Sequence, residues 1–277
     1  MKNIFDIQKK YGLELLVLIL LGLMYFKSAI LWGREWVNFD SFYSYGLFMP
    51  VFLFYFIKRN KEQLINLKIE PSMCGFCVLI LGCLVYFVGE KINYQIFIDS
   101  SFPIVLSGLI LSFYGKKQFL ACLWPLLILS ISLPILPIIR LTIPLQLFFS
   151  AVTSSFLHFL GVTTQQVGSV LYMNGTAVSI EPGCAGLKSL LNLTALAFMY
   201  SYFIKSSILK KSLFVALSIF ISLISNMFRI SFSGFYLIFN GHKGFEQFHY
   251  ALGLIFYIIG IFLLLFIANN IEEPACE

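Results

Sequence analysis

The chain has 277 residues, of which 59% are hydrophobic and only 12% are charged. Because a soluble domain carries roughly 25% charged residues, this composition excludes an ordinary soluble protein. The mean hydropathy is +0.89, and apolar runs reach about 20 residues, the length that crosses a bilayer. We therefore predict an all-α polytopic membrane protein. The net charge is +6, and the basic residues are scattered between the apolar runs. They form no basic stripe of the kind that binds a phosphate backbone, so we expect no nucleic-acid partner.

The apolar runs predict about eight transmembrane helices in a single integral-membrane domain, residues 1–277. The expected spans are 13–32, 41–57, 73–89, 102–115, 118–136, 184–204, 212–235 and 246–268. The first run follows a basic N-terminus as a signal peptide would, but it is longer than the usual core of about 7–15 residues and no cleavage site follows. We assign it to the first helix. Residues 1–133 are generic transmembrane helices.

The stretch between the fifth and sixth expected spans has a different pattern. Residues 138–160 are apolar yet contain Pro144 and polar side chains, which favours an interfacial or re-entrant element on the outer side. Residues 167–180 then alternate polar and apolar residues around Asn174-Gly175, a hairpin signal. We expect a small outer cap beside Cys184.

The distribution of Lys and Arg between the spans predicts the orientation. With a cytoplasmic N-terminus, the inner side carries twelve: Lys2, Lys9, Lys10, Lys58, Arg59, Lys61, Lys68, Lys116, Lys117, Lys205, Lys210 and Lys211. The outer side carries five: Arg34, Lys91, Arg140, Lys188 and Lys243. We therefore expect a multi-pass protein of the cytoplasmic membrane, with both termini inside and with Cys184, Arg229 and His249 near the extracytoplasmic face.

Six cysteines stand at positions 74, 77, 83, 122, 184 and 276. Cys74 and Cys77 form a C-x-x-C, but it opens an apolar run without a βαβ pattern, so we interpret the five cysteines other than Cys184 as small buried residues. Further Cys or His pairs are lacking nearby, and we predict neither a metal site nor a cofactor.

Cys184 is the exception because of its local sequence. Pro182-Gly183 favours a turn, after which Cys184 is expected to start a helix. The positive end of a helix favours thiolate over thiol, and its first N–H groups could donate to an oxyanion. Gly183 and Gly186 leave room for an extended peptide. The alternative is another small buried cysteine.

Arg229 lies within an expected span, where a guanidinium must be paired or face a polar site. The nearby acids Glu181 and Glu246 lie at the outer surface, so Arg229 is available to stabilise a thiolate, a substrate carboxylate or an oxyanion. A structural ion pair is the alternative. Asn226, one helical turn earlier, shares the face of Arg229.

His249, at the start of the last span, is the natural general base and acid, because an imidazole titrates near neutral pH. His242 falls in a polar connection and is expected to be solvated. His158 is expected to be structural. Lys188, one turn after Cys184, adds positive potential to the thiol.

Three segments resemble the signatures of the exosortase/archaeosortase family. They are Glu181-Pro-Gly-Cys184-Ala-Gly-Leu-Lys188, Asn226-Met-Phe-Arg229-Ile and Phe248-His249. Members carry a Cys between small residues before Gly-Leu/Ile-Arg/Gln/Lys, then N-x-x-R, then a His about twenty residues later. Here the interval is 249 − 229 = 20. Residues 143–146 and 172–180 also match the family's approach to the cysteine, and the likeness covers residues 134–260. Gly183 stands where the family often has another small residue.

The resemblance implies a membrane cysteine protease or transpeptidase that forms a thioacyl intermediate. Its substrates would be secreted proteins with a C-terminal sorting signal, made of a short motif of the Pro-Glu-Pro type, a transmembrane helix and a basic tail. Cys184 would be the nucleophile, Arg229 the stabiliser of charge and His249 the proton shuttle. Membrane lipids would surround the enzyme, and water or an amine of a lipid or glycan would accept the acyl group.

The alternative from another functional class is a transporter or channel that binds an anion at Arg229. This alternative predicts broken helices in two related halves of the chain, and no matching pair of such helices is evident in the sequence.

Overall fold

The computed structural model describes residues 2–39, 41–135, 139–173 and 176–271, without the side chains of residues 2–11 and 139–141. The chain divides into two compact units. One comprises Met1–Asp40 and Gly46–Ile135, and the other comprises Ser41–Tyr45 and Leu136–Glu277. The two units are described separately below.

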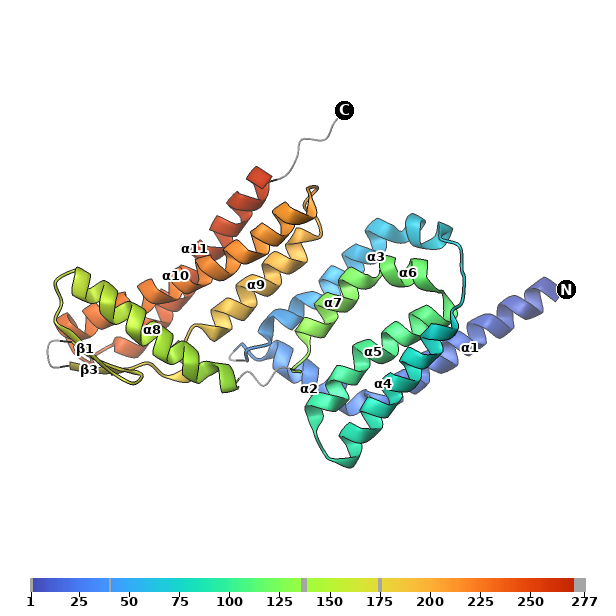
Figure 1. Ribbon diagram of the computed structural model, residues 1–277, viewed down its shortest axis with the longest axis horizontal. Coiled ribbons are helices and arrows are strands. Elements are labelled where there is room, and N and C mark those ends of the chain that lie inside the picture. The colour runs from blue at the N-terminus through green and yellow to red at the C-terminus, as the bar shows by residue number, and fades with distance from the viewer. Residues whose placement is uncertain (1, 40, 136–138, 174–175, 272–277) are drawn as a thin grey trace. The chain divides into compact units, whose positions relative to one another are not determined.

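The first unit is helical. Its helices are α1 (Lys2–Met24), α2 (Phe26–Val37), α3 (Met49–Asn66), α4 (Met73–Lys91), α5 (Gln95–Phe113), α6 (Lys116–Ala121) and α7 (Leu123–Ser132), and the 3₁₀ turn η1 (Ser44–Phe48) precedes α3. Helices α4 and α5 form a close hairpin (Figure 1). Gly75, Gly82 and Gly89 recur every seven residues where α4 meets α5, and a Cβ on Gly82 would lie 2.9 Å from the backbone nitrogen of Val105. Small residues thus allow the two backbones to approach closely.

The first expected span is bent rather than continuous. Helices α1 and α2 meet at 67° at Tyr25. The Tyr25 hydroxyl lies 2.5 Å from Ser101 Oγ, and the Tyr86 hydroxyl donates to the carbonyl of Met24 at 2.8 Å. These contacts pair polar groups at the bend that would otherwise be buried without a partner.

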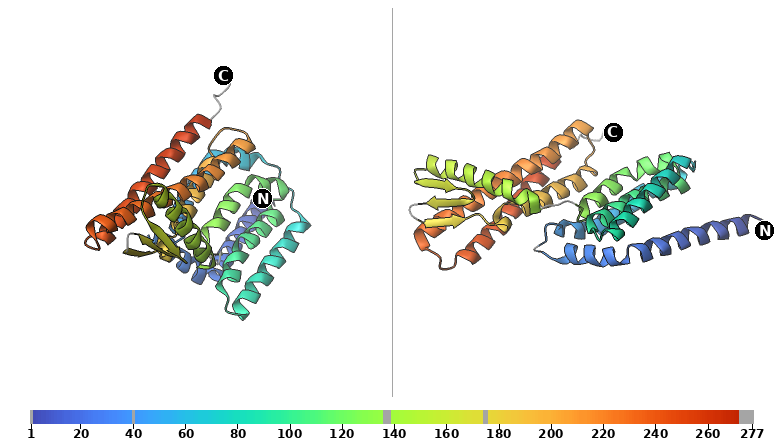
Figure 2. Two further views of the ribbon diagram at one scale, coloured as in Figure 1. Left: turned by 60° about the vertical axis from the view of Figure 1, so that its left-hand side comes forward. Right: turned by 60° about the horizontal axis from the view of Figure 1, so that its bottom comes forward.

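The described part of the second unit consists of four helices and a small three-stranded sheet, the cap. Its elements are α8 (Ile139–Phe159), β1 (Thr164–Val167), β2 (Val170–Met173), β3 (Thr176–Ser179), the 3₁₀ turn η2 (Pro182–Cys184), α9 (Leu187–Ser201), α10 (Ile208–Asn240) and α11 (Phe245–Ile271). Figures 1 and 2 show the strands beside α8, at the end of the α10–α11 pair where these two helices are joined.

The predicted hairpin is confirmed. Strands β2 and β3 are antiparallel, with Met173 opposite Thr176; the turn residues 174 and 175 lie outside the described part of the chain. The structure adds a strand that the sequence interpretation missed, because β1 pairs with β2 to give a three-stranded sheet. Helix α8 is not among the candidate spans. Its place on the outer side stays a prediction.

The cap is attached through a buried apolar cluster. Phe149 and Leu157 of α8, Leu171 and Met173 of β2, and Ile230 of α10 belong to it. Ile180, just after β3, belongs to the same cluster, and Cys184 packs against its edge. The sheet therefore fixes the segment that leads to the cysteine.

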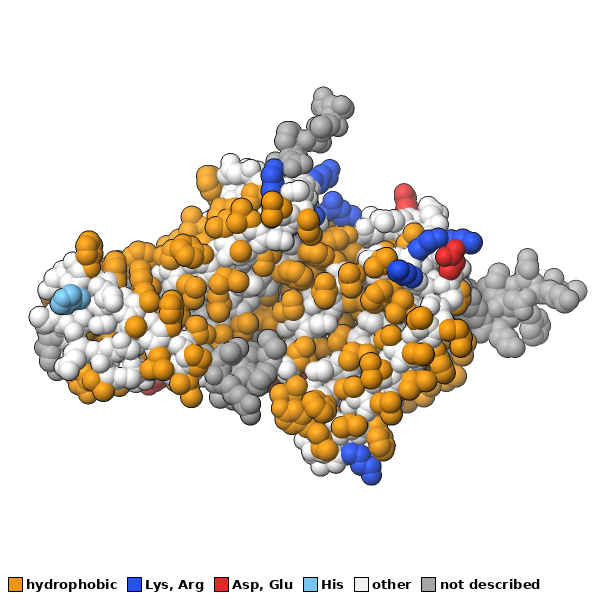
Figure 3. Space-filling view, viewed as in Figure 1, with side chains coloured by type: hydrophobic (Ala, Val, Ile, Leu, Met, Phe, Trp, Pro, Cys, Tyr) orange, Lys and Arg blue, Asp and Glu red, His pale blue; other side chains and the backbone are white. Residues whose placement is uncertain are grey.

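The expected count of eight spans is not confirmed. Four described helices are long and apolar enough to cross a membrane, namely α4, α5, α10 and α11, and the bent pair gives five if it crosses as one span. The expected span 118–136 is divided between α6 and α7 at Cys122. Helix α9 has only 15 residues, or about 22 Å at 1.5 Å per residue, which is shorter than a hydrocarbon core of about 30 Å. Hydrophobic side chains cover much of the visible helix surfaces in Figure 3, as in a membrane protein.

Candidate active site

The segment before Cys184 is held by hydrogen bonds from two directions. The Ile180 N–H donates to the carbonyl of Ser169 at 2.9 Å, and Gln146 Nε2 of α8 donates to the carbonyl of Ile180 at 2.8 Å. The chain then makes the 3₁₀ turn η2, in which the Cys184 N–H donates to the carbonyl of Glu181 at 2.8 Å. Cys184 is therefore presented on a short turn supported by both α8 and the sheet.

Cys184 does not start a helix, contrary to expectation. Helix α9 begins three residues later at Leu187, and its N-cap, Gly186, has a left-handed φ of +68°. A Cβ on Gly186 would lie 2.5 Å from the side-chain amide of Asn226. Glycine is thus needed at position 186 both for its backbone conformation and for space. Asn226 uses this proximity to donate from Nδ2 to the carbonyl of Cys184 at 3.2 Å.

Cys184 and His249 are in direct contact although 65 residues separate them. Cys184 Sγ lies 3.2 Å from His249 Nε2. The other ring nitrogen, Nδ1, lies 2.7 Å from the hydroxyl oxygen of Ser233. The sequence interpretation did not include Ser233. The available signal was its spacing, because it follows Arg229 by four residues on α10 and so shares the same helix face.

Arg229 extends from α10 over the turn that carries the thiol. Its Nη2 donates to the carbonyl of Gly183 at 3.5 Å. A Cβ on Gly253 of α11 would lie 3.4 Å from Nη1, so the guanidinium rests against α11 at a glycine. Among the described residues, no carboxylate forms an ion pair with Arg229. The structure thus brings Cys184, Arg229 and His249 together.

The electrostatic environment of the thiol differs from the expectation of a helix N-terminus. Burial raises the pKa of Cys184 above its usual value, the charge and hydrogen bond of Arg229 lower this pKa, and the carboxylate of Glu181 raises it. Burial dominates, so the resting group is a thiol. A thiol needs a proton acceptor before it can act as a nucleophile, and His249 Nε2 lies within hydrogen-bond distance of it.

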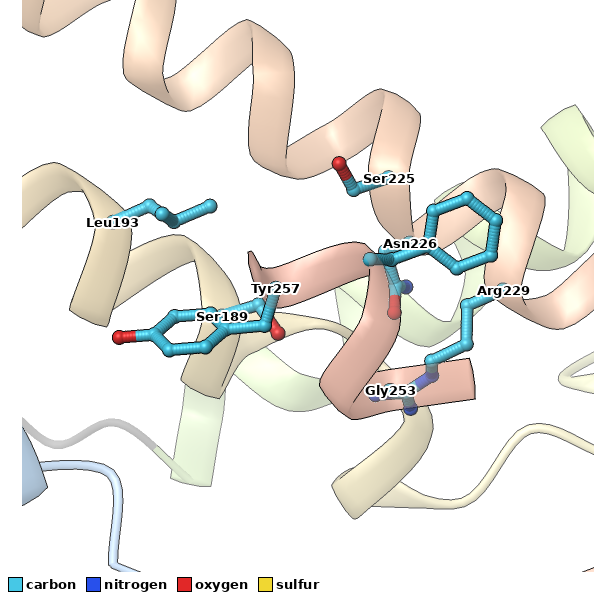
Figure 4. A pocket seen from close by; sticks show the side chains of 8 residues that line it. Ser189, Leu193, Ser225, Asn226, Arg229, Gly253 and Tyr257 are labelled. Atoms are coloured by element: carbon cyan, nitrogen blue, oxygen red, sulfur yellow. The ribbon is translucent and has the colours of Figure 1, made fainter. Parts of the chain in front are cut away.

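A small pocket lies beside Arg229, at the junction of α9, α10 and α11 (Figure 4). It is lined by Ser189, Leu193, Ser225, Asn226, Arg229, Gly253, Phe256 and Tyr257. Two buried atoms of its lining residues, Arg229 Nε and Asn226 Oδ1, have no hydrogen-bond partner in the described part of the chain. One of these two atoms is a hydrogen-bond donor and the other is an acceptor.

The remaining residues that the sequence analysis singled out differ in how exposed they are. Glu181 is exposed, and Lys188 is half-buried in the first turn of α9. His242 is exposed in the α10–α11 connection, as expected, but His158 is exposed on α8 rather than enclosed.

The expectation of five further buried cysteines is wrong for three of them. Cys74, Cys77 and Cys83 are exposed on α4, and Cys122 is half-buried; Cys276 lies outside the described residues. All five described cysteines are free thiols. Within the described ranges, no three His, Cys, Asp or Glu side chains gather as metal ligands would.

Comparison with known proteins identifies one family. A family model described as transmembrane exosortase (Exosortase_EpsH) matches residues 32–266. No curated protein and no solved structure matches the chain. The family match covers both units and includes all three predicted catalytic residues.

Proposed function

Because the chain belongs to the transmembrane exosortase family, we propose that it is a membrane cysteine transpeptidase or protease whose nucleophile is Cys184. Family membership supports a transpeptidase-type role in the membrane in general terms. The observation that carries the finer proposal is the contact of 3.2 Å between Cys184 Sγ and His249 Nε2 beside the Arg229 guanidinium. A thiol, a proton acceptor and a fixed cation form the set that acyl transfer through a thioester requires.

The first half-reaction forms a thioester. His249 Nε2 takes the thiol proton, and Cys184 Sγ attacks the carbonyl carbon of the scissile peptide bond. Arg229 stabilises the negative charge that develops on the carbonyl oxygen. The C–N bond then breaks, and the proton on Nε2 passes to the leaving amine. Transfer of the thiol proton to His249 is necessary because burial of the thiol disfavours a free thiolate.

The second half-reaction releases the acyl group. His249 Nε2 takes a proton from the incoming nucleophile, which attacks the thioester carbonyl, and the C–S bond breaks. The Cys184 thiolate recovers a proton from His249. Water as the nucleophile gives hydrolysis, and an amine of a lipid or glycan gives transpeptidation. The proposed substrates are secreted proteins with a C-terminal sorting signal, processed at the extracytoplasmic face.

A processing assay tests the proposal. The protein is produced with a secreted reporter that ends in a sorting signal of short motif, apolar helix and basic tail, and reporter cleavage is measured together with the enzyme's abundance. Cys184→Ala should abolish cleavage at unchanged abundance. The control replaces Cys74, Cys77, Cys83, Cys122 and Cys276 by Ser, and this single-cysteine protein should remain active. Cleavage by Cys184→Ala would refute the proposal.

A further inference from the structure

The imidazole of His249 is contacted through both of its nitrogens. Nε2 lies 3.2 Å from Cys184 Sγ, and Nδ1 lies 2.7 Å from Ser233 Oγ. A neutral imidazole has one N–H and one lone pair. Nε2 can accept the thiol proton only if the hydrogen is on Nδ1, and a buried Nδ1–H needs an acceptor of its own.

From this geometry we propose that Ser233 is a positioning residue that accepts a hydrogen bond from His249 Nδ1–H. Ser233 thereby holds the ring in the tautomer and orientation that take the proton from Cys184. The inference rests on the proposed function and adds a fourth member to its site. The hydroxyl of Ser233 contacts His249 and not the thiol, so it acts through His249.

The burial of Ser233 makes its hydroxyl difficult to replace by water. Only 2% of the residue is exposed. Next to it on α10 is Gly234, where a Cβ would lie 2.9 Å from the side chain of Met173 in β2. The cap sheet thus closes over this part of α10. A ring nitrogen that lost Ser233 would remain in a poorly solvated place without its acceptor.

A hydroxyl in this position has a different electrostatic effect from a carboxylate. The charged or titratable groups around the ring are Cys184 on η2 and Arg229 on α10, with Glu181 next to the thiol. On α11 itself, Glu246 is exposed. Ser233 can orient the imidazole without supplying a negative charge. Ser233 therefore adds no negative charge that would favour an imidazolium, and burial raises the pKa of Cys184, which favours a neutral thiol.

The chain offers a matched control on the same helix. Ser231 is 1% exposed and Ser233 is 2% exposed. The hydroxyl of Ser231 instead donates to the carbonyl of Met227, one turn earlier on α10, at 2.9 Å. Ser231→Ala therefore removes a buried hydroxyl without touching His249.

The test measures the rate at which iodoacetamide alkylates the single-cysteine protein, in detergent, as a function of pH. Ser233→Ala should slow alkylation at neutral pH by about 10-fold, the scale of one lost buried hydrogen bond, and move the midpoint of the profile to higher pH. Ser233→Thr keeps a hydroxyl and should restore the wild-type profile. Ser231→Ala should leave the profile unchanged. When purified protein in detergent is assayed over a range of reporter concentrations, Ser233→Ala should lower kcat and leave KM near its wild-type value.

A direct measurement does not depend on any variant. In protein labelled with ¹⁵N-histidine, the chemical shifts of His249 should show a protonated Nδ1 and an unprotonated Nε2. The opposite tautomer would overturn the proposal, as would a Ser233→Ala profile that coincides with that of Ser231→Ala. If His249→Ala changes the profile and Ser233→Ala does not, only the role of Ser233 fails. If His249→Ala processes the reporter normally, the proposed function itself fails.

Discussion

Arg229 combines two properties that substitution can separate, a positive charge and a planar fork of donors. Arg229→Lys keeps a charge near the thiol, so the pKa of Cys184 should stay close to its wild-type value. Reporter processing should nevertheless fall by about 10²-fold, the scale seen when an oxyanion donor is lost. Arg229→Ala removes both the charge and the hydrogen bond that lower the pKa of Cys184, so that pKa should rise further. Iodoacetamide alkylation of the single-cysteine protein as a function of pH measures it. Near-normal processing by Arg229→Lys would exclude a specific role for the guanidinium.

The sequence predicts those site residues whose polar or charged side chains have a high free energy inside a membrane. A buried guanidinium and a helical imidazole stand out in an apolar run, and their convergence on Cys184 is observed. Ser233 does not stand out in this way, because a serine inside a helix commonly forms a hydrogen bond with the backbone of its own helix. Its role depends on a contact with a residue sixteen positions away on another helix. The expectation of a low thiol pKa is wrong because desolvation of Cys184 raises this pKa by more than the charge of Arg229 lowers it.

At the scale of elements, the start of α9 depends on a single glycine. Gly186→Ala would combine a left-handed φ with a clash against Asn226, whereas Gly168→Ala has a similar φ of +61° in open space. Overpacking costs about 1–3 kcal/mol, so Gly186→Ala should destabilise the protein by that amount more than Gly168→Ala does. Thermal unfolding in detergent measures the difference. Equal melting temperatures for the two variants would contradict the close approach of α9 and α10.

A buried carboxylate in α5 connects this helix to α2. Asp99 is fully buried and accepts from Trp32 Nε1 at 2.9 Å and from Gln95 Nε2 at 2.8 Å. Asp99→Leu removes the acceptor and should destabilise the protein by about 1–3 kcal/mol. Asp99→Asn keeps an acceptor oxygen and should cost less. Ser107→Ala is the control, because it removes only a hydrogen bond to the carbonyl of Pro103 on the same helix. If thermal unfolding shows the same loss of stability for Asp99→Leu as for the control, the hydrogen bond between α2 and α5 does not stabilise the protein.

The elements that the sequence failed to predict share a physical cause. Hydropathy averaged over a window does not detect the bend at Tyr25 or the division at Cys122. At the bend, side chains of α4 and α5 contact Met24 and Tyr25, and a window along one helix does not include such contacts. The hairpin was predictable because its alternation and its Asn174-Gly175 turn are local. Strand β1 is short, and three of its four residues are exposed, so it lacks the apolar alternation that marks a strand.

At the scale of the whole molecule, the excess of Lys and Arg predicts which face of the membrane holds the site. The two ends of α11 provide a matched pair of positions, His242 just before the helix and Asn269 near its end, both exposed. In a variant without other cysteines, a membrane-impermeant thiol reagent added to intact cells should label His242→Cys and not Asn269→Cys. Permeabilised cells, in which both should react, provide the control. The reverse pattern would place the site in the cytoplasm, where secreted proteins are not processed.

The covalent intermediate is the most direct test of the proposed chemistry. The enzyme is incubated with the reporter and quenched in acid, and the acyl group of the reporter is located by mass spectrometry of the digested protein. A thioester on Cys184 should be found that hydroxylamine cleaves, and it should be absent from Cys184→Ala. It should also form in the single-cysteine protein. Reporter cleavage without an acyl group on Cys184, or with the acyl group on another residue, would contradict Cys184 as the nucleophile.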